Sequence, residues 1–227
     1  MDIEKLLTFV DHTLLSQTAT PQQILRACDE GLRYNTASVC IPPCYVRLAN
    51  EHCGKRLAVC TVIGFPNGSN SSGVKLYEAQ DALQNGADEL DMVINLGLVK
   101  SGDFSGVQRE ISQIKDVCRD KILKVIVETC LLTEREKIEM CRVVSHSGAD
   151  FIKTSTGFAG GGATQDDIIL FKKYVEPHVK IKAAGGISTI KDARRFLELG
   201  ASRLGTSRII KLICERSENH ELSDTSY

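Results

Sequence analysis

The sequence predicts a single (β/α)8 barrel, an α/β fold, preceded by a short N-terminal helix. Three observations predict it: strand-like and helix-like segments alternate until eight strands have passed, no linker-like stretch divides them, and one glycine turn recurs between helices and strands. A chain of 227 residues suffices for one large α/β domain or two small ones. The unbroken alternation favours one domain over residues 1–216, followed by a polar tail at residues 217–227.

The first elements are a short helix, a strand and a capped helix. Apolar residues at positions 3, 6, 7 and 10 have helical spacing, and a strand-like run follows at residues 11–15. Thr20 and Pro21 then provide a hydroxyl cap and a proline at the first helical position, and Gly31 is expected to end that helix. Residues 36–41 form the next predicted strand, and Pro42 and Pro43 open the helix after it.

The remaining segments repeat this order. We expect strands at residues 57–63, 89–95, 122–129, 150–154, 179–184 and 202–205, and helices at 73–85, 103–119, 133–147, 164–176, 188–199 and 206–216. The recurring glycine turns lie at residues 85–88, 147–150 and 199–202, where a helix must turn tightly into a strand. A doubly wound open sheet is the alternative, but no G-x-G-x-x-G sequence follows the first strand.

Composition excludes several classes of function. The net charge is −1 and no basic cluster is interleaved with aromatic residues, so we expect no nucleic-acid partner. No segment reaches the roughly 18 apolar residues that span a bilayer, and the N-terminus lacks a signal-peptide pattern, which predicts a cytoplasmic protein without a membrane partner. The nine cysteines form no paired C-x-x-C motifs and the five histidines show no metal-binding spacing. Free thiols and no metal or other cofactor are therefore expected.

Lys153, a lysine within an apolar strand, is the first candidate for chemistry. Burying a lysine costs several kcal/mol unless the amine is neutral or paired, and a neutral amine is a nucleophile. A strand-end lysine that extends to water is the alternative. The following turn, rich in hydroxyl groups and glycine, then reads as part of a substrate pocket.

Two more ionisable residues are expected near Lys153, because barrel active sites are assembled at the C-terminal ends of the strands. Lys182 lies on the next strand, roughly 4.8 Å away, and two ammonium groups this close disfavour charging of both. Asp91, flanked by apolar residues, is suited to proton transfer or to pairing with either lysine. A purely structural Asp–Lys pair with a spare lysine is the alternative, but three such residues around one barrel favour an active site.

Two glycine turns predict a phosphate site. Gly185 and Gly186 allow backbone N–H groups to approach an anion, and Thr206 and Ser207 open the last predicted helix. These turns follow strands seven and eight, where barrel enzymes often bind phosphate. The expected substrate is therefore a small phosphorylated molecule.

Seven segments of the chain resemble the deoxyribose-phosphate aldolase family. They lie at residues 11–15, 39–42, 62–66, 89–95, 125–129, 151–158 and 182–187, and the run K-T-S-T-G-F at 153–158 is highly specific. The resemblance extends from about residue 5 to residue 210. It implies a metal-free class I aldolase of deoxyribose catabolism that reversibly cleaves 2-deoxy-D-ribose 5-phosphate to D-glyceraldehyde 3-phosphate and acetaldehyde.

The resemblance also assigns roles by position. It implies a Schiff-base lysine at Lys153, with Lys182 and Asp91 moving protons, and a homodimer. It implies supporting roles for Asp11 and Thr13 near Lys182, although a plain strand-end role for Asp11 is the alternative. The other implied positions are a phosphate site at Thr156, Gly157, Gly185, Gly186, Thr206 and Ser207, a pocket-lining Cys40, and a C-terminal Tyr227 that reaches the site or belongs to a simple polar tail.

Two other functions stay open on the sequence. One is a different Schiff-base aldolase of the same fold that acts on another phosphorylated sugar. The other is a catalytically idle barrel that binds a sugar phosphate. The idle barrel predicts loss of the lysine or the aspartate, whereas Lys153 and Asp91 are both present.

Overall fold

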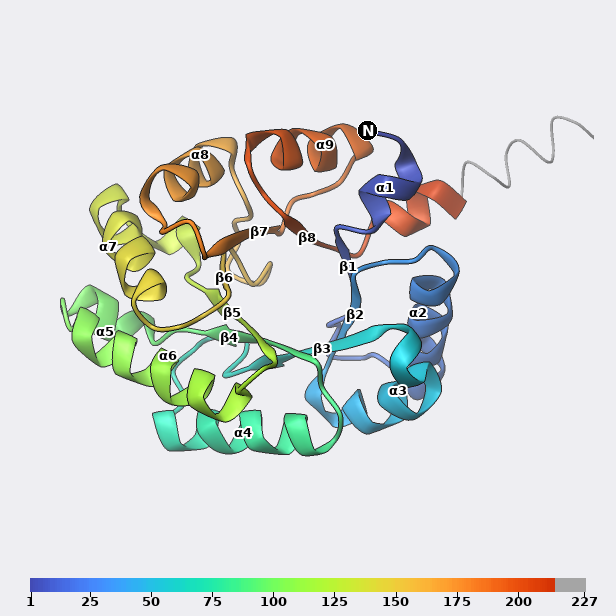
Figure 1. Cartoon of the computed structure of the whole chain (residues 1–227), viewed down its shortest axis with the longest axis horizontal. Helices are drawn as coiled ribbons and strands as arrows, with labels where there is room; N and C mark the ends of the chain where they lie inside the picture. Colours follow the sequence, from blue (N-terminus) through green and yellow to red (C-terminus); the bar gives the residue numbers. More distant parts are fainter. Residues whose placement is uncertain (215–227) are drawn as a thin grey trace, which may run out of the picture.

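The computed structural model describes residues 1–214, and these residues form a closed barrel of eight parallel strands. Each strand pairs with its sequence neighbours, and β8 pairs with β1 to close the sheet. Figure 1 shows the strands at the centre and the helices arranged around them. The predicted (β/α)8 architecture with a short N-terminal helix is confirmed.

The strands are short, and four of the eight end earlier than predicted. β5 ends at Ile126 because Glu128 adopts a left-handed backbone conformation, with φ of 55°, that a strand ladder does not accommodate. The strands are β1 (Val10–Thr13), β2 (Ser38–Ile41), β3 (Ala58–Ile63), β4 (Glu89–Val93), β5 (Ile122–Ile126), β6 (Phe151–Lys153), β7 (Lys180–Ala184) and β8 (Arg203–Thr206).

The helices follow the predicted order, with one addition. The unpredicted helix is α5, a short helix whose first turn is capped by the Asn95 side chain. The helices are α1 (Ile3–Leu7), α2 (Pro21–Arg33), α3 (Val46–Cys53), α4 (Ser72–Gln84), α5 (Leu96–Lys100), α6 (Phe104–Cys118), α7 (Glu134–Ser145), α8 (Gln165–Tyr174) and α9 (Ile190–Leu199), and a final helical segment is described over residues 209–214.

Two local predictions for α2 and α3 need correction. Thr20 caps α2 as predicted, but the helix continues past Gly31 to Arg33. Gly31 is buried, and a Cβ there would lie 2.6 Å from the Leu57 side chain, so glycine permits close packing rather than ending the helix. Pro42 and Pro43 lead into a 3₁₀ turn, and α3 begins only at Val46.

The three recurring turns behave as predicted. Gly86, Gly148 and Gly200 all have positive φ angles, of 100°, 81° and 119°. Residues with a Cβ rarely adopt this conformation, so glycine suits the step from each helix into the next strand.

The core lies between the barrel and its surrounding helices. Alternate strand residues such as Leu90, Val125 and Ile152 pack into one hydrophobic cluster with helix residues. The residues between them point into the barrel, and several of these are charged. This alternation separates a dry structural layer from a polar interior that opens at the C-terminal ends of the strands.

Candidate active site

Seven charged side chains meet inside the barrel. Strand register places Asp91 beside Lys124 and Lys153 beside Lys182. We call this group the interior charge cluster; its members are Asp11 on β1, Glu89 and Asp91 on β4, Lys124 on β5, Lys153 on β6, Lys182 on β7 and Arg203 on β8.

Asp91 is the centre of the interior charge cluster. Its Oδ2 accepts hydrogen bonds from the Nζ atoms of Lys153 at 2.7 Å and Lys182 at 2.6 Å. Its Oδ1 accepts from Lys124 Nζ at 2.8 Å. Burial raises the pKa of Asp91, but the three surrounding lysine side chains outweigh burial and hold this pKa well below its usual range. Asp91 is therefore an anion at neutral pH.

Lys182 is held between two carboxylates. Its Nζ lies 2.5 Å from Asp11 Oδ2 and 2.6 Å from Asp91 Oδ2. Burial lowers the pKa of Lys182, but Asp11 and Asp91 raise it above the usual lysine value. Lys182 is therefore a cation next to Lys153, and the structure brings Asp11 into the contact expected of it.

Lys124 is a member of the site that the sequence reasoning missed. Its Nζ lies 2.6 Å from Glu89 Oε2 as well as 2.8 Å from Asp91 Oδ1. Burial lowers the pKa of Lys124, but Asp91 and Glu89 are among the groups that raise it well above the usual value. The same sequence pattern that identified Lys153, a lysine inside an apolar, β-branched strand, could have identified Lys124.

Glu89 and Arg203 complete the interior charge cluster, and they were also not predicted. Each is the first residue of its strand, so the pair lies toward the N-terminal side of the barrel. Arg203 Nη1 lies 2.6 Å from Asp11 Oδ1 and 3.0 Å from Glu89 Oε2. Arg203 therefore connects Asp11 on β1 to Glu89 on β4 and holds the Asp11 carboxylate in place.

Lys153 is the member of the interior charge cluster that lines a large cavity. The cavity has a volume of about 780 Å³ and lies at the C-terminal ends of the strands. It is the place where a substrate can meet the Lys153 amine. The predicted phosphate-binding positions and Thr13 also line it: Thr13, Thr156, Gly157, Gly185, Gly186, Thr206 and Ser207.

Glycine packing brings two cavity loops together. Gly185 and Gly186 have consecutive positive φ angles of 79° and 73°. In the loop after β6, a Cβ on Gly162 would lie 2.5 Å from the carbonyl carbon of Gly185. Glycine is therefore required at this contact, which sets the spacing between the two loops.

Several polar side chains that line the cavity already form hydrogen bonds within the protein. Glu128 accepts from the Thr156 backbone N–H at 3.2 Å and from the Thr156 hydroxyl. The Thr206 hydroxyl donates to the Ile187 carbonyl at 3.0 Å. The Thr13 hydroxyl donates to the Asp11 carbonyl at 2.8 Å, so Thr13 lines the cavity and supports Asp11 through the backbone.

The sequence of this barrel matches one family over most of its length. A model of the DeoC/LacD family aldolases matches residues 5–208. The chain belongs to this aldolase family.

Relatives and solved structures agree with that membership. The aldolase is similar to deoxyribose-phosphate aldolase of Streptococcus pyogenes serotype M28, with 60% identity over 94% of this chain and 96% of that protein. It is 56% identical to the enzyme of the same name from Streptococcus agalactiae serotype Ia, over 100% of both chains. A putative deoxyribose-phosphate aldolase from Coccidioides immitis superimposes with a TM-score of 0.90 at 39% identity, covering 94% of this chain and 87% of that one.

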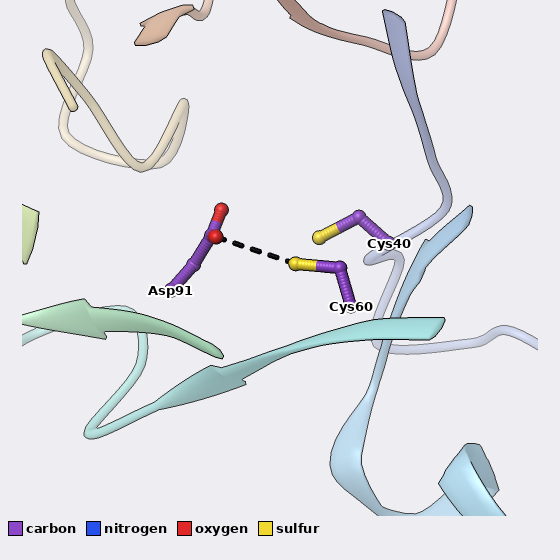
Figure 2. Close-up of side chains that lie close together, drawn as sticks. All are labelled: Cys40, Cys60 and Asp91. Carbon is purple, nitrogen blue, oxygen red and sulfur yellow. Dashed lines mark hydrogen bonds between the residues drawn. The ribbon is translucent and has the colours of Figure 1, made fainter. Parts of the chain in front are cut away.

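Cys40 of the aldolase does not line the cavity, which corrects the prediction. Its side chain is fully buried next to Cys60 on the adjacent strand (Figure 2). Leu15, which does line the cavity, packs against the small cluster that contains both thiols. The neighbouring Cys60 lowers the pKa of Cys40, whereas burial raises it. Access to Cys40 therefore requires movement of the cavity wall.

The two thiols and Asp91 form a group with metal-ligand spacing. Their ligand atoms lie within 4.8 Å of one another, and Cys60 Sγ donates to Asp91 Oδ1 at 3.3 Å (Figure 2). Three lysine side chains already occupy the Asp91 carboxylate, and the charged ones, Lys124 and Lys182, would repel a divalent cation. Burial raises the pKa of Cys60 well above its usual value, so this thiol is not a ready ligand. The group is poorly suited to hold a metal.

Tyr227 and the rest of the predicted tail lie outside the described residues. Within residues 1–214, no helix has the length and apolar composition needed to cross a bilayer.

Proposed function

We propose that this aldolase cleaves 2-deoxy-D-ribose 5-phosphate to D-glyceraldehyde 3-phosphate and acetaldehyde through a Schiff base on Lys153. The observation that carries the proposal is the position of Lys153 Nζ, on a cavity wall and 2.7 Å from the buried Asp91 carboxylate, with Lys182 on the same oxygen. The names of the relatives with 56–60% identity support the choice of substrate.

The charge count of the interior charge cluster supports a neutral amine at Lys153. Four cations, Lys124, Lys153, Lys182 and Arg203, face three carboxylates. Each of the other three cations contacts two or more carboxylates, whereas Lys153 contacts only Asp91 among the described residues. Loss of one proton from Lys153 therefore balances the cluster and provides the nucleophile.

The proposed reaction proceeds through an imine. The Lys153 amine adds to the C1 aldehyde, and loss of water from the carbinolamine gives a protonated imine. The C2–C3 bond then breaks as the C3 hydroxyl loses its proton, and the imine accepts the electron pair as an enamine. D-Glyceraldehyde 3-phosphate leaves, the enamine carbon takes up a proton, and water hydrolyses the imine to release acetaldehyde.

We assign proton transfer to Asp91 and Lys182. Lys182 is kept charged by two carboxylates and is placed to donate a proton to the departing carbinolamine hydroxyl. Asp91 is placed to relay protons through water to and from the substrate. Backbone N–H groups of the turns at Gly185 to Gly186 and at Thr206 to Ser207 are proposed to hold the phosphate. No metal or other cofactor enters these steps, because the imine itself accepts the electrons.

The proposal also covers the cellular compartment, oligomeric state and partners of the enzyme. All nine cysteines are free thiols, which supports a reducing compartment such as the cytoplasm. A homodimer remains a proposal that rests on the family resemblance, and sedimentation velocity would test it. No nucleic-acid or membrane partner is proposed.

Borohydride trapping tests the proposed function. Incubation with 2-deoxyribose 5-phosphate and sodium borohydride should leave a reduced adduct on Lys153, identified by peptide mass mapping. Lys153→Leu should abolish acetaldehyde release and trapping, while Lys180→Leu, at an exposed lysine on β7, should retain both. An adduct formed only with another sugar phosphate would favour a different Schiff-base aldolase, and the absence of any adduct would contradict the mechanism.

A further inference from the structure

Arg208 is a charged residue on the cavity wall that the proposed reaction does not use. It follows Ser207 at the C-terminal end of β8 and is exposed. Its backbone N–H donates to the Thr206 hydroxyl at 3.1 Å, which orders the start of this segment. The side chain therefore begins beside the turn that is proposed to hold the phosphate.

The described lining of the cavity carries positive charge without a balancing carboxylate. Lys153 and Arg208 are its charged residues, and none of the lining residues is aspartate or glutamate. Lys153 is engaged with Asp91 beneath the cavity. Arg208 takes part in none of the salt bridges found within residues 1–214. Its guanidinium is thus the cation on this wall that is available to an anion.

Arginine adds something that the glycine turns lack. Backbone N–H groups form hydrogen bonds with a phosphate and also with a neutral hydroxyl group. A guanidinium presents a planar set of donors together with a full positive charge, which matches phosphate oxygens and strengthens each hydrogen bond. A wall with both features binds a phosphate ester in preference to the free alcohol.

We propose that Arg208 is the side-chain cation that binds the substrate phosphate and sets the preference of the enzyme for phosphorylated over non-phosphorylated 2-deoxyribose. This inference rests on the proposed function and names a residue for its phosphate site. Arg208 contacts the phosphate end of the substrate, so its removal weakens binding and leaves the chemistry at Lys153 in place.

The test compares two sugars and two Arg208 variants. Arg208→Gln is expected to lower the ratio of kcat/KM for 2-deoxyribose 5-phosphate to kcat/KM for 2-deoxyribose by about 10–100-fold, as expected for the loss of a charged hydrogen bond. The change should fall on KM rather than kcat. Arg208→Lys, which keeps the positive charge but lacks the planar set of guanidinium donors, should restore part of the ratio. Arg109→Gln removes an exposed arginine from α6 and should leave the ratio unchanged.

Binding of inorganic phosphate separates this inference from the proposed function. Calorimetry should show weaker phosphate binding by Arg208→Gln than by the wild type, whether or not the sugar is cleaved. If the wild type does not cleave 2-deoxyribose 5-phosphate, the proposed function fails, and the calorimetry still tests Arg208. An equal loss of activity toward both sugars, or unchanged phosphate binding, would overturn the assignment of Arg208.

Discussion

Asp91 receives hydrogen bonds from lysines on three different strands, and Lys153 is the one of the three that lines the cavity. Lys124 joins Asp91 to Glu89 inside the barrel. Removing one partner of a buried ion pair leaves an uncompensated charge, which costs far more than the loss of a surface pair. Lys124 should therefore affect both the stability of the barrel and the charge balance of the interior charge cluster.

Lys124→Met is expected to lower the free energy of unfolding by about 3–5 kcal/mol. It should also reduce activity at neutral pH, because three cations then face three carboxylates and Lys153 is no longer the surplus charge. Urea denaturation and steady-state kinetics measure the two effects.

Lys121→Met is the matched control for this variant. Lys121 Nζ lies 2.6 Å from Asp88, but its side chain is 40% exposed. The cost should stay below about 1 kcal/mol, as for other exposed pairs. Unchanged activity of Lys124→Met at neutral pH would argue against the charge-count explanation for Lys153.

At the scale of elements, the active site depends on how the loops after β6 and β7 pack. Gly162 approaches the backbone of Gly185, while Gly185 and Gly186 adopt positive φ angles. Ala163 N–H donates to the Ala184 carbonyl at 3.0 Å, so a backbone hydrogen bond also joins the two loops. The turn at Gly185 and Gly186, which is proposed to hold the phosphate, is therefore supported from the side by the loop that follows Lys153.

Gly162→Ala is expected to raise KM for the phosphorylated substrate by about 10-fold, because the new methyl group overpacks the contact with Gly185. The methyl group would lie 2.6 Å from the Gly185 carbonyl oxygen, and backbone atoms cannot rotate away as a side chain can. Gly73→Ala on α4, where no heavy atom lies within 4 Å, provides the control and should leave KM unchanged. Equal KM values for the two variants would refute the proposed loop contact.

Closure of the barrel across the whole molecule brings carboxylates and lysines together, and their pKa values are shifted in opposite directions. The pKa values of Asp11 and Asp91 are lowered, since Lys124 and Lys182 outweigh the effect of burial. The pKa values of Lys124 and Lys182 are raised by the same contacts. The interior charge cluster thus links the stability of the fold to pH at both ends of the scale.

The pH dependence of unfolding follows from these directions. A lowered carboxylate pKa stabilises the fold above the unfolded value, about 3.9, and this stabilisation is lost as pH falls through the folded pKa. A raised lysine pKa stabilises the fold below about 10.4 and is lost as pH rises through the folded pKa. The contribution of Asp11, Asp91, Lys124 and Lys182 to the free energy of unfolding should be flat between about pH 4 and pH 10 and decline outside that range.

Urea titrations at several pH values measure this dependence. Asp11→Asn should reduce the acid slope by at most about 1.4 kcal/mol per pH unit, the effect of one titrating group. If the slope below pH 4 is the same in this variant, Asp11 is not one of the groups responsible.

Local sequence signals accounted for much of the barrel and part of the site. Thr20 and the glycines at positions 86, 148 and 200 marked helix starts and turns correctly, because caps and positive φ angles depend on neighbouring residues. The prediction that Gly31 ends α2 was wrong, because the role of Gly31 depends on Leu57, which approaches it only in the folded chain. Lys124 was not predicted, although it is the one charged residue in a strand that otherwise consists of apolar residues.

By itself, the sequence determined the order of strands and helices, the glycine turns and the residues that merit attention as nucleophile, proton carrier and phosphate site. Only the tertiary structure decided which of those residues meet. Asp91 and Lys182 are separated by 91 positions, yet their atoms lie 2.6 Å apart. Local propensity contains no information about such a contact; barrel closure and strand register create it, and with it the interior charge cluster beneath the cavity.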